Sequence, residues 1–574
     1  MGVTLDMDTT SRPVPAQRVR GRVLIVLVSV LALALFASVA SASTHGSTHA
    51  AKRGSQATGA LVIAAEQELD TADWIDASAG SSWGNWTLGI ETLPQAFSIM
   101  PDGTYRPGPV LAETPVLDPG PPMKVTYTIN KKAVWSDGQP ITSSDFQYLW
   151  KQITTGQNIY DETGYDKIKS IDTSDPKVAV VTFSEPYAAW RDLFGGFYFL
   201  VPSHLLQGKD RNAEMKDGYA FSGGPWMLKG GASGWQKGTS ITLVPNPKYW
   251  GTKPRIAQVT FQFITNSSSE AQAVTSGQVA AAYPQPQIGM LDQFDKETNL
   301  KYTVDFGNTY EGLWLNAAKP PLDSKNVRQA LAYATDRKAI VDNLLLPAVR
   351  KGQVLQSFNV PTFKKFTSRP FAKYTHNLTK VNQLMQADGW KKNSSGIWEK
   401  NGQPAKVEIS TTAGNQGREQ VEQLLQSQWK QAGFDLSINN TQSGVLFGTW
   451  GPQGVFTIGM YAQVGTPDPG LCIILCSNNI PTAQNGFVGQ NWTRLVSPAL
   501  DRPWKAADRE LDVSKRAALV KQAEAVAAED VPAIPLYQKP TVFVWDKNKI
   551  NGPLVNNTTN GPFWNMNQWS VQPG

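Results

Sequence analysis

Apolar runs alternate with turn-rich segments along the chain in a way that predicts strands followed by amphipathic helices. The first buried strand is predicted over Gly59–Leu69, and Met123–Asn130 alternates apolar and polar residues as a half-buried strand does. Further strands are predicted over 177–187, 239–250 and 255–264, with turn residues between them. Strands that alternate with helical patterns favour an α/β fold.

Two of the predicted helices have clear start signals. Ser136-Asp137-Gly138 predicts a tight turn, and Thr142 is the expected N-cap of a helix that carries Asp145 in its first turn. Asp323 is the expected N-cap of a second helix, which follows a Pro-Pro stop. The first of these helices has apolar residues at helical spacing, namely Phe146, Leu149, Trp150 and Ile153. We expect these segments to support the fold and not to take part in catalysis or binding.

The clearest α/β unit lies between about residues 390 and 440. A strand is predicted over 405–412, a helix over 418–433 and a second strand over 434–439, an order that implies a right-handed parallel crossover. In such sheets ligands bind beyond the carboxyl ends of the strands, beside helix N-termini. The polar residues at that point are Thr411, Thr412, Asn415 and Gln416. The alternative is that Asn415 only caps its helix.

The length of 574 residues predicts two or more domains. Arginines at 18, 20 and 22 precede an apolar run over 23–39, and Ala40-Ser41-Ala42 supplies a small-residue cleavage site, so residues 1–42 are expected to be a secretory signal peptide. The alternative is an uncleaved membrane anchor. No cysteine lies near the cleavage site, which argues against a lipid-anchored export signal. Residues 43–58 are expected to form a flexible tether.

The charge balance argues against a nucleic-acid partner. The chain has 53 Lys and Arg against 47 Asp and Glu, and residues 1–42 hold four Arg against two Asp, so the remainder is only about +4. It contains no long basic run that would form the concentrated basic face a nucleic acid requires.

Catalytic motifs are scarce. Of the four histidines, two lie in the tether, which leaves His204 and His376 in the folded body. The string GSSWG at 80–84 matches a hydrolase nucleophile pattern with Ser82 in the nucleophile's place, but no strand precedes it and no clear helix follows. We therefore expect no enzyme, and keep an exported hydrolase built on Ser82 as a distant alternative.

Cys472 and Cys476 are the only cysteines and lie four residues apart. In an oxidising compartment they can close a small disulfide loop, and the alternative is a pair of buried thiols. Two cysteines without a nearby histidine make an incomplete zinc shell, so we expect neither a metal site nor a cofactor.

Six segments, taken together and in order, resemble a known family. They read VWSDGQPITSSDF (134–146), SGGPWML (222–228), NPKYWG (246–251), LNAAKPPLDSKNVRQALAYATDRKAIV (315–341), QNWTRLVSPALDRPWKAADRELD (490–512) and VPAIPLYQKP (531–540). This series resembles the recurring blocks of the family 5 extracellular solute-binding proteins, the oligopeptide- and dipeptide-binding components of ABC importers. The resemblance extends from about Leu61 to about Gly552.

The resemblance implies an α/β, bilobal periplasmic-binding-protein type II fold with an extra subdomain in lobe I. Lobe I is expected over 59–312 and lobe II over 313–535, with 536–574 returning to lobe I. It also implies a protein that captures a peptide or similar small solute outside the cytoplasmic membrane by hinge closure and delivers it to an ABC permease and ATPase. The sequence gives no sign of an oligomer, so a monomer is expected. A sensor or cell-envelope assembly factor on the same fold is the alternative.

The ligand is where the chain departs from the family pattern. Peptide binders of the family commonly hold the ligand's amino group with an Asp, and Gln463 stands at that position here. Thr411 and Thr412 stand where dipeptide binders carry an Arg, so both charged clamps are missing. This favours longer peptides held through their backbone, or an uncharged ligand such as a glycan. The predicted ligand-binding residues are Trp83, Asn85, Trp86, Thr412, Asn415, Gln416, Trp450, Tyr461 and Gln463.

Overall fold

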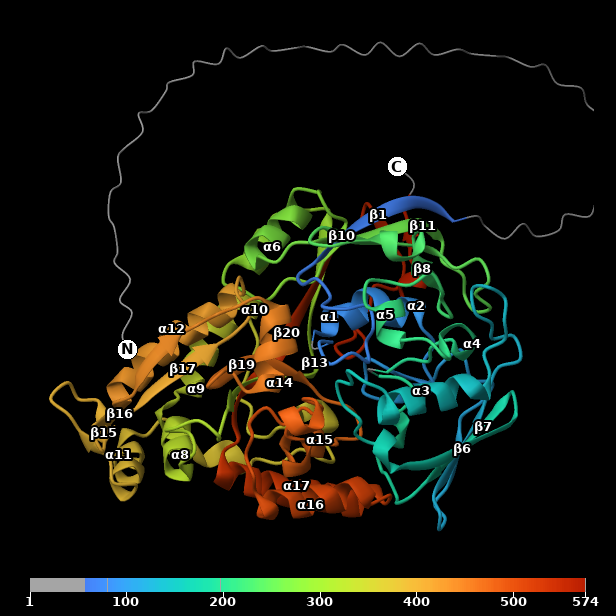
Figure 1. The fold of residues 1–574 in the computed structure, drawn as a ribbon. Helices are drawn as coiled ribbons and strands as arrows, with labels where there is room; N and C mark the ends of the chain where they lie inside the picture. The colour runs from blue at the N-terminus through green and yellow to red at the C-terminus, as the bar shows by residue number, and fades with distance from the viewer. Residues whose placement is uncertain (1–56, 80, 197, 573–574) are drawn as a thin grey trace, which may run out of the picture. The chain divides into compact units, whose positions relative to one another are not determined.

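The computed structural model describes residues 57–79, 81–196 and 198–572, all within the compact unit Ser55–Gly574 (Figure 1). The predicted signal peptide and nearly all of the predicted tether lie outside the described residues. Among the helices of the described part, none has both the length and the hydrophobicity needed to cross a bilayer.

A single mixed sheet forms the frame of the molecule. Its strands lie in the order β18, β17, β19, β13, β20, β12, β1, β11, β10 and β8, and β9 pairs with β10. Their bounds are β1 Thr58–Ala65, β8 Trp226–Leu228, β9 Trp235–Gln236, β10 Ser240–Pro245, β11 Ile256–Phe263, β12 Ala281–Ala282, β13 Leu300–Leu315, β17 Lys406–Ser410, β18 Asp435–Ile438, β19 Ile458–Val464 and β20 Ala533–Asp546. The strands predicted over 59–69, 239–250 and 255–264 are confirmed as β1, β10 and β11.

The long strands β13 and β20 join the two halves of this sheet. They pair antiparallel along most of their length, β19 pairs with β13, and β12 pairs with β20. Figure 1 shows both strands in the middle of the fold. The predicted lobe boundaries at 312/313 and 535/536 fall inside them, and those boundaries stay a prediction.

Buried hydrophobic side chains gather in two clusters. The first core contains residues of β1, β10 and β11, of the sheet β4–β7 and of the C-terminal segment around Trp569. The second core contains residues of β13, β17 and β19 and of the helices α8, α12, α16 and α17. Burial on this scale is the main favourable contribution to folding. Two separate cores are what a bilobal protein of this length requires.

A four-stranded antiparallel sheet with one helix forms a separate layer of the first core. Its order is β4, β5, β7, β6, with bounds β4 Val116–Asp118, β5 Lys124–Thr128, β6 Ile168–Asp175, β7 Val178–Phe183 and α3 Ser143–Thr155. The helix starts at the predicted N-cap: Thr142 N donates to Asp145 Oδ2 at 2.9 Å. Phe146, Leu149 and Ile153 are buried, as their helical spacing predicts.

The predicted α/β unit is also present. β17 and β18 are parallel neighbours, and α12, Gln416–Ala432, connects them. Asn415 caps this helix, accepting from Arg418 N at 3.1 Å, and Gly433 ends it with a φ of 97°, a conformation that favours glycine. The helix therefore begins two residues before the predicted position.

The remaining long helices pack on the second core or beside it. Their bounds are α6 Ser267–Thr275, α8 Lys325–Ala334, α11 Leu378–Ala387, α16 Pro498–Arg509 and α17 Val513–Asp530. One predicted cap was wrong by a residue: Ser324, not Asp323, caps α8, because its side chain accepts from Val327 N while Asp323 is exposed. Shorter helices used below are α1 Ser82–Gly84 and α15 Cys472–Leu475.

Candidate ligand-binding cavity

A cavity of about 190 Å³ is lined by segments that belong to both cores. One wall comes from 74–82 and from two loops that flank the sheet β4–β7; the other comes from 358–363, the end of β19 and the segment 469–492. The first wall presents Trp74, Ala79, Ser82, Tyr160, Asp161, Thr163, Tyr165, Tyr187, Ala189, Asp192, Leu193, Gly195 and Tyr198. The second presents Phe358, Asn359, Phe363, Phe447, 461–466, 469–471, Ile473, Ile474, Gln490 and Trp492.

Aromatic rings make up much of the second wall. Tyr461 stacks on Trp314, with ring centroids 5.3 Å apart and planes 13° apart, and it meets Phe447 and Trp492 edge to face at 5.7 Å each. Because three rings and the strand β19 hold Tyr461 in place, its position on the cavity wall is rigid. Such walls suit apolar side chains and sugar rings alike.

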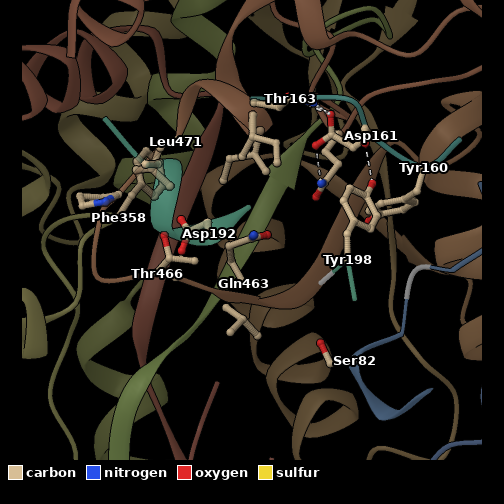
Figure 2. Close-up of a pocket in the computed structure, with 18 of the residues that line it drawn as sticks. Ser82, Tyr160, Asp161, Thr163, Asp192, Tyr198, Phe358, Gln463, Thr466 and Leu471 are labelled. Carbon is tan, nitrogen blue, oxygen red and sulfur yellow. Dashed lines mark hydrogen bonds between the residues drawn. The ribbon is translucent and has the colours of Figure 1, made fainter. Parts of the chain in front are cut away.

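Asp161 is the most enclosed charged group of the first wall, with 3% of its surface exposed. Its Oδ1 accepts from Thr163 N at 3.0 Å and from Thr163 Oγ1 at 2.8 Å, and its Oδ2 accepts from Gln490 Nε2 at 2.8 Å. The hydroxyl of Tyr198 donates to the Asp161 carbonyl oxygen at 2.6 Å (Figure 2). Burial raises the pKa of this carboxyl to about 6, despite these bonds.

Asp192 is half-buried and lies near Gln463 and Thr466 in Figure 2. Its Oδ1 accepts from the hydroxyl of Tyr105 at 2.6 Å. Burial, aided by the negative charge of Asp468, raises the pKa of the Asp192 carboxyl to about 7. Among the residues that line the cavity, Asp161 and Asp192 are the charged side chains, and none is Lys, Arg or His.

Of the nine predicted ligand-binding residues, Tyr461 and Gln463 line this cavity. Gln463 lies near the end of β19, where it pairs with Tyr310 of β13. Asp468, five residues on, is mostly buried and pairs with Arg516, and its Oδ2 lies 3.8 Å from Arg191 Nη1. The nearby Asp-Pro carboxylate is therefore already occupied by two guanidinium groups.

Trp83, Asn85 and Trp86 lie behind the wall that Ser82 lines. Trp86 Nε1 donates to Thr559 O at 2.9 Å, and Asn85 Nδ2 donates to Gly196 O at 3.2 Å. Trp83 packs against Trp86 with centroids 5.5 Å apart, within the first core. All three have their contacts inside the protein rather than on the cavity.

Thr412, Asn415 and Gln416 lie near a second, smaller cavity of about 30 Å³, of which Asn415 forms part of the lining. Arg418 links this region: its Nη1 donates to Thr412 Oγ1 at 3.0 Å, and its Nε lies 3.0 Å from Glu311 Oε1 in a buried ion pair. Gln416 Oε1 accepts from Ser268 Oγ at 2.8 Å.

Trp450 lies apart from both cavities, half-buried against the second core. Sequence reasoning placed it at the cleft and passed over Trp492, which lines the cavity. It also missed Asp161 and Asp192. Asp161 lies in a loop and Asp192 in the short 3-10 helix Trp190–Asp192, both outside the recognisable blocks, and only the folded chain brings them to one wall.

Ser82 lies on the cavity wall, at the start of α1, without a histidine beside it among the lining residues. His204 Nε2 lies 2.7 Å from Asp137 Oδ2, away from the cavity. Cys472 and Cys476 are joined by a disulfide across one turn, next to Ile473 and Ile474 of the wall. In the part of the chain that the structure describes, no group of three or more His, Cys, Asp or Glu is placed to hold a metal ion.

Comparison with known proteins agrees with this geometry. The oligopeptide-binding protein OppA of Mycobacterium tuberculosis is 27% identical over 459 residues, which cover 78% of this chain and 75% of that protein. The oligopeptide-binding protein AppA from Bacillus subtilis, solved with a nonapeptide, has a TM-score of 0.80 at 18% identity, covering 91% of this chain and all of the other.

A second solved structure, the periplasmic EDTA-binding protein EppA, has a TM-score of 0.77 at 23% identity and covers 91% of this chain and 98% of the other. These likenesses confirm the predicted bilobal fold of the type II class. The family model for bacterial extracellular solute-binding proteins, family 5 Middle, matches residues 106–482. The chain therefore belongs to the family 5 bacterial extracellular solute-binding proteins.

Proposed function

We propose that this chain is the extracytoplasmic substrate-binding component of an ABC importer and that it captures a peptide or a similar small solute in the cavity described above. Peptide binding is named for OppA and AppA, and EDTA for EppA, so proteins of this architecture bind peptides as well as other small solutes. The membrane permease and its ATPase are the proposed partners, and the monomer is the proposed working form.

The observation that carries the proposal is that one cavity takes its walls from both cores. Contacts also cross directly between them: Gln490 Nε2 donates to Asp161 at 2.8 Å, and Gly489 N donates to Tyr160 O at 3.1 Å. A ligand that touches both walls binds the closed arrangement better than an open one, and it shifts the equilibrium by that difference in affinity.

The first test is calorimetry with peptides of two to eight residues, combined with small-angle scattering. At least one length should bind saturably and reduce the radius of gyration, because closure brings the two lobes together. If no length binds, the peptide part of the proposal fails. If a ligand binds and the scattering curve does not change, closure fails.

Tryptophan fluorescence locates the ligand with a matched control. Ligand addition should change the emission of the unaltered protein. A Trp492→Phe variant should lose a large part of that change, because Trp492 and Trp74 are the two tryptophans that line the cavity, whereas Trp450→Phe should retain it. The reverse result would place the ligand near Trp450, as the sequence predicted.

A further inference from the structure

The charge of the cavity wall is negative and lacks a counter-charge. Asp161 and Asp192 both line the cavity, while its lining holds no Lys, Arg or His. The other polar groups on the wall are neutral, such as Asn359, Gln463 and Gln490. A ligand enclosed here meets two carboxyl groups and many neutral or aromatic side chains.

The hydrogen bonds of both carboxyl groups come from neutral donors. Asp161 accepts from Thr163 and Gln490, and Asp192 accepts from the hydroxyl of Tyr105. A neutral donor stabilises a carboxylate but leaves its net charge in place. Neither carboxyl group has an ion-pair partner within 4.0 Å among the described residues.

The nearby arginine side chains interact with another carboxylate. Arg516 pairs with Asp468, and Arg191 Nη1 lies 3.8 Å from Asp468 Oδ2 while its guanidinium stacks over Trp190 at 4.3 Å. Asp468 is not one of the residues that line the cavity. The protein therefore pairs the carboxylate outside the cavity with two arginines, whereas the two carboxyl groups inside it make no ion pair among the described residues; Arg516 acts on Asp192 only through its charge at longer range.

An unpaired carboxylate in a cavity that closes over its ligand is costly, because it has lost water and gained no opposite charge. Burial already raises the pKa of both groups, which agrees with this environment. A ligand cation would supply the missing charge. A ligand carboxylate at the same place would instead be repelled, because like charges in a dehydrated site have no compensating donor.

We propose that the cavity selects ligands that carry an ammonium or similar organic cation, which Asp192 contacts directly and Asp161 attracts from the same wall. Asp192 is the contacting group because it is half-buried, whereas Asp161 is enclosed by its own donors. Tyr160 and Tyr187, on the same wall, present rings that can face a cation. This inference rests on the proposed function and names the class of solute that the site binds.

The sequence pattern did not predict carboxyl groups on the cavity wall that could select the ligand by charge. With Gln463 in place of the family's Asp, a cation clamp looked absent, yet the structure places two carboxyl groups on the wall formed by the other core. The cation can be the free amino end of a peptide, a basic side chain or a free organic amine, and the experiment separates these sources.

The probes are pentapeptide amides of one apolar sequence, so that none carries a terminal carboxylate. One has a free amino end, one is N-acetylated, one is N-acetylated with a central Lys, and one is N-acetylated with a central Glu. Calorimetry should show the free-amine or Lys peptide binding at least about tenfold tighter than the neutral one, as expected for a charge-assisted bond that replaces a neutral contact. Whichever of the two binds tighter identifies the source of the cation.

Two variants test whether Asp192 contacts the ligand cation. Asp192→Asn should remove the preference for cationic peptides, so that they bind no tighter than the neutral one, while Asp118→Asn, which replaces an exposed carboxylate on β4, should preserve the preference. Gln463→Lys places an ammonium on the cavity wall from the opposite side and should weaken cation binding even if Asp192→Asn folds poorly. Circular dichroism and the melting temperature establish folding in each case.

A parallel thermal-shift series with putrescine, spermidine, ribose and citrate separates the inference from the peptide proposal. If no peptide binds and the amines stabilise the protein, the peptide class fails and the cation inference stands. Equal or tighter binding of the neutral or Glu peptide, greatest stabilisation by ribose or citrate, or no binding of any probe in either series would overturn the inference.

Discussion

We expect Asp192 to affect stability as well as ligand choice. Its pKa in the folded protein is about 7, and an unfolded chain returns it to about 3.9. The folded state therefore holds the proton more tightly, so the stabilising contribution is complete below pH 4 and is lost as the pH rises through about 7. The groups that face it are Tyr105, Thr466, Asp468 and Arg516.

The prediction is that Asp192→Asn raises the melting temperature at pH 8 by roughly 1–3 °C and raises it clearly less at pH 5. The amide removes a charge that is unfavourable only when the carboxyl group is ionised. Asp102→Asn is the control, because bonds from Thr104 lower the pKa of that exposed carboxyl group and its replacement should bring no gain at pH 8. An equal gain for both variants would contradict the assignment.

Single residues of the site were the least predictable part from sequence. The sequence placed Trp83 and Trp86 at the cleft, but it cannot show which way a large ring faces, and in the structure both are buried behind Ser82. Tyr461 and Gln463 line the cavity, and they were predicted from the resemblance of residues 460–470 to a family segment rather than from the local pattern. Asp161 and Asp192 depend on long-range packing.

At the scale of elements, the start of helix α12 allows a capping role of Asn415 to be distinguished from a ligand-binding role. Asn415 Oδ1 accepts from Arg418 N at 3.1 Å, while Asn415 also lines the smaller cavity. Asn415→Ala should lower the free energy of unfolding by about 1 kcal/mol, because a helix loses its N-cap. Asn415→Ser should recover most of this, and both variants should bind ligand as the unaltered protein does.

The measurement combines thermal unfolding with calorimetry on the same preparations. A folded Asn415→Ala protein with much weaker ligand binding would assign Asn415 to the ligand site instead of the cap.

The elements themselves followed well from local chemistry. The strand–helix–strand unit β17–α12–β18 was predicted because its helix and strands have different apolar periods and a glycine ends the helix. The α8 cap was misassigned because Asp323 and Ser324 are both good caps and adjacent, and only the chain direction after Pro321 decides between them. Contacts between distant elements gave no such local signal.

At the scale of the whole molecule, one ion pair joins the two sides of the cavity. Arg509 of α16 lies 2.5 Å from Glu185, which follows β7, and the Ala188 amide donates to Asp508 O at 2.6 Å. These contacts join segments on the two sides of the cavity. Because the arginine is exposed, the pair is weak and screened by salt.

Arg509→Glu should therefore weaken ligand binding about 3- to 10-fold at low salt, since repulsion from Glu185 favours the open state. The loss should shrink at 0.5 M salt. Lys505→Glu is the control, because Lys505 lies on the same helix and pairs within it, with Asp501 at 3.3 Å. Calorimetry at two salt concentrations checks the prediction; equal losses for both variants would point to net charge instead of a contact across the cavity.

The order of the chain through the two cores has a further consequence. The first core takes residues from β1 near the start of the described chain and from Phe563, Met566 and Trp569 near its end, and all of the second core except Ala64 is encoded between them. The amino-terminal half therefore cannot complete its interior while the rest is still being synthesised. A chain that stops after β20 would leave that interior open to water, so loss of a short tail would damage the half of the molecule that was made first.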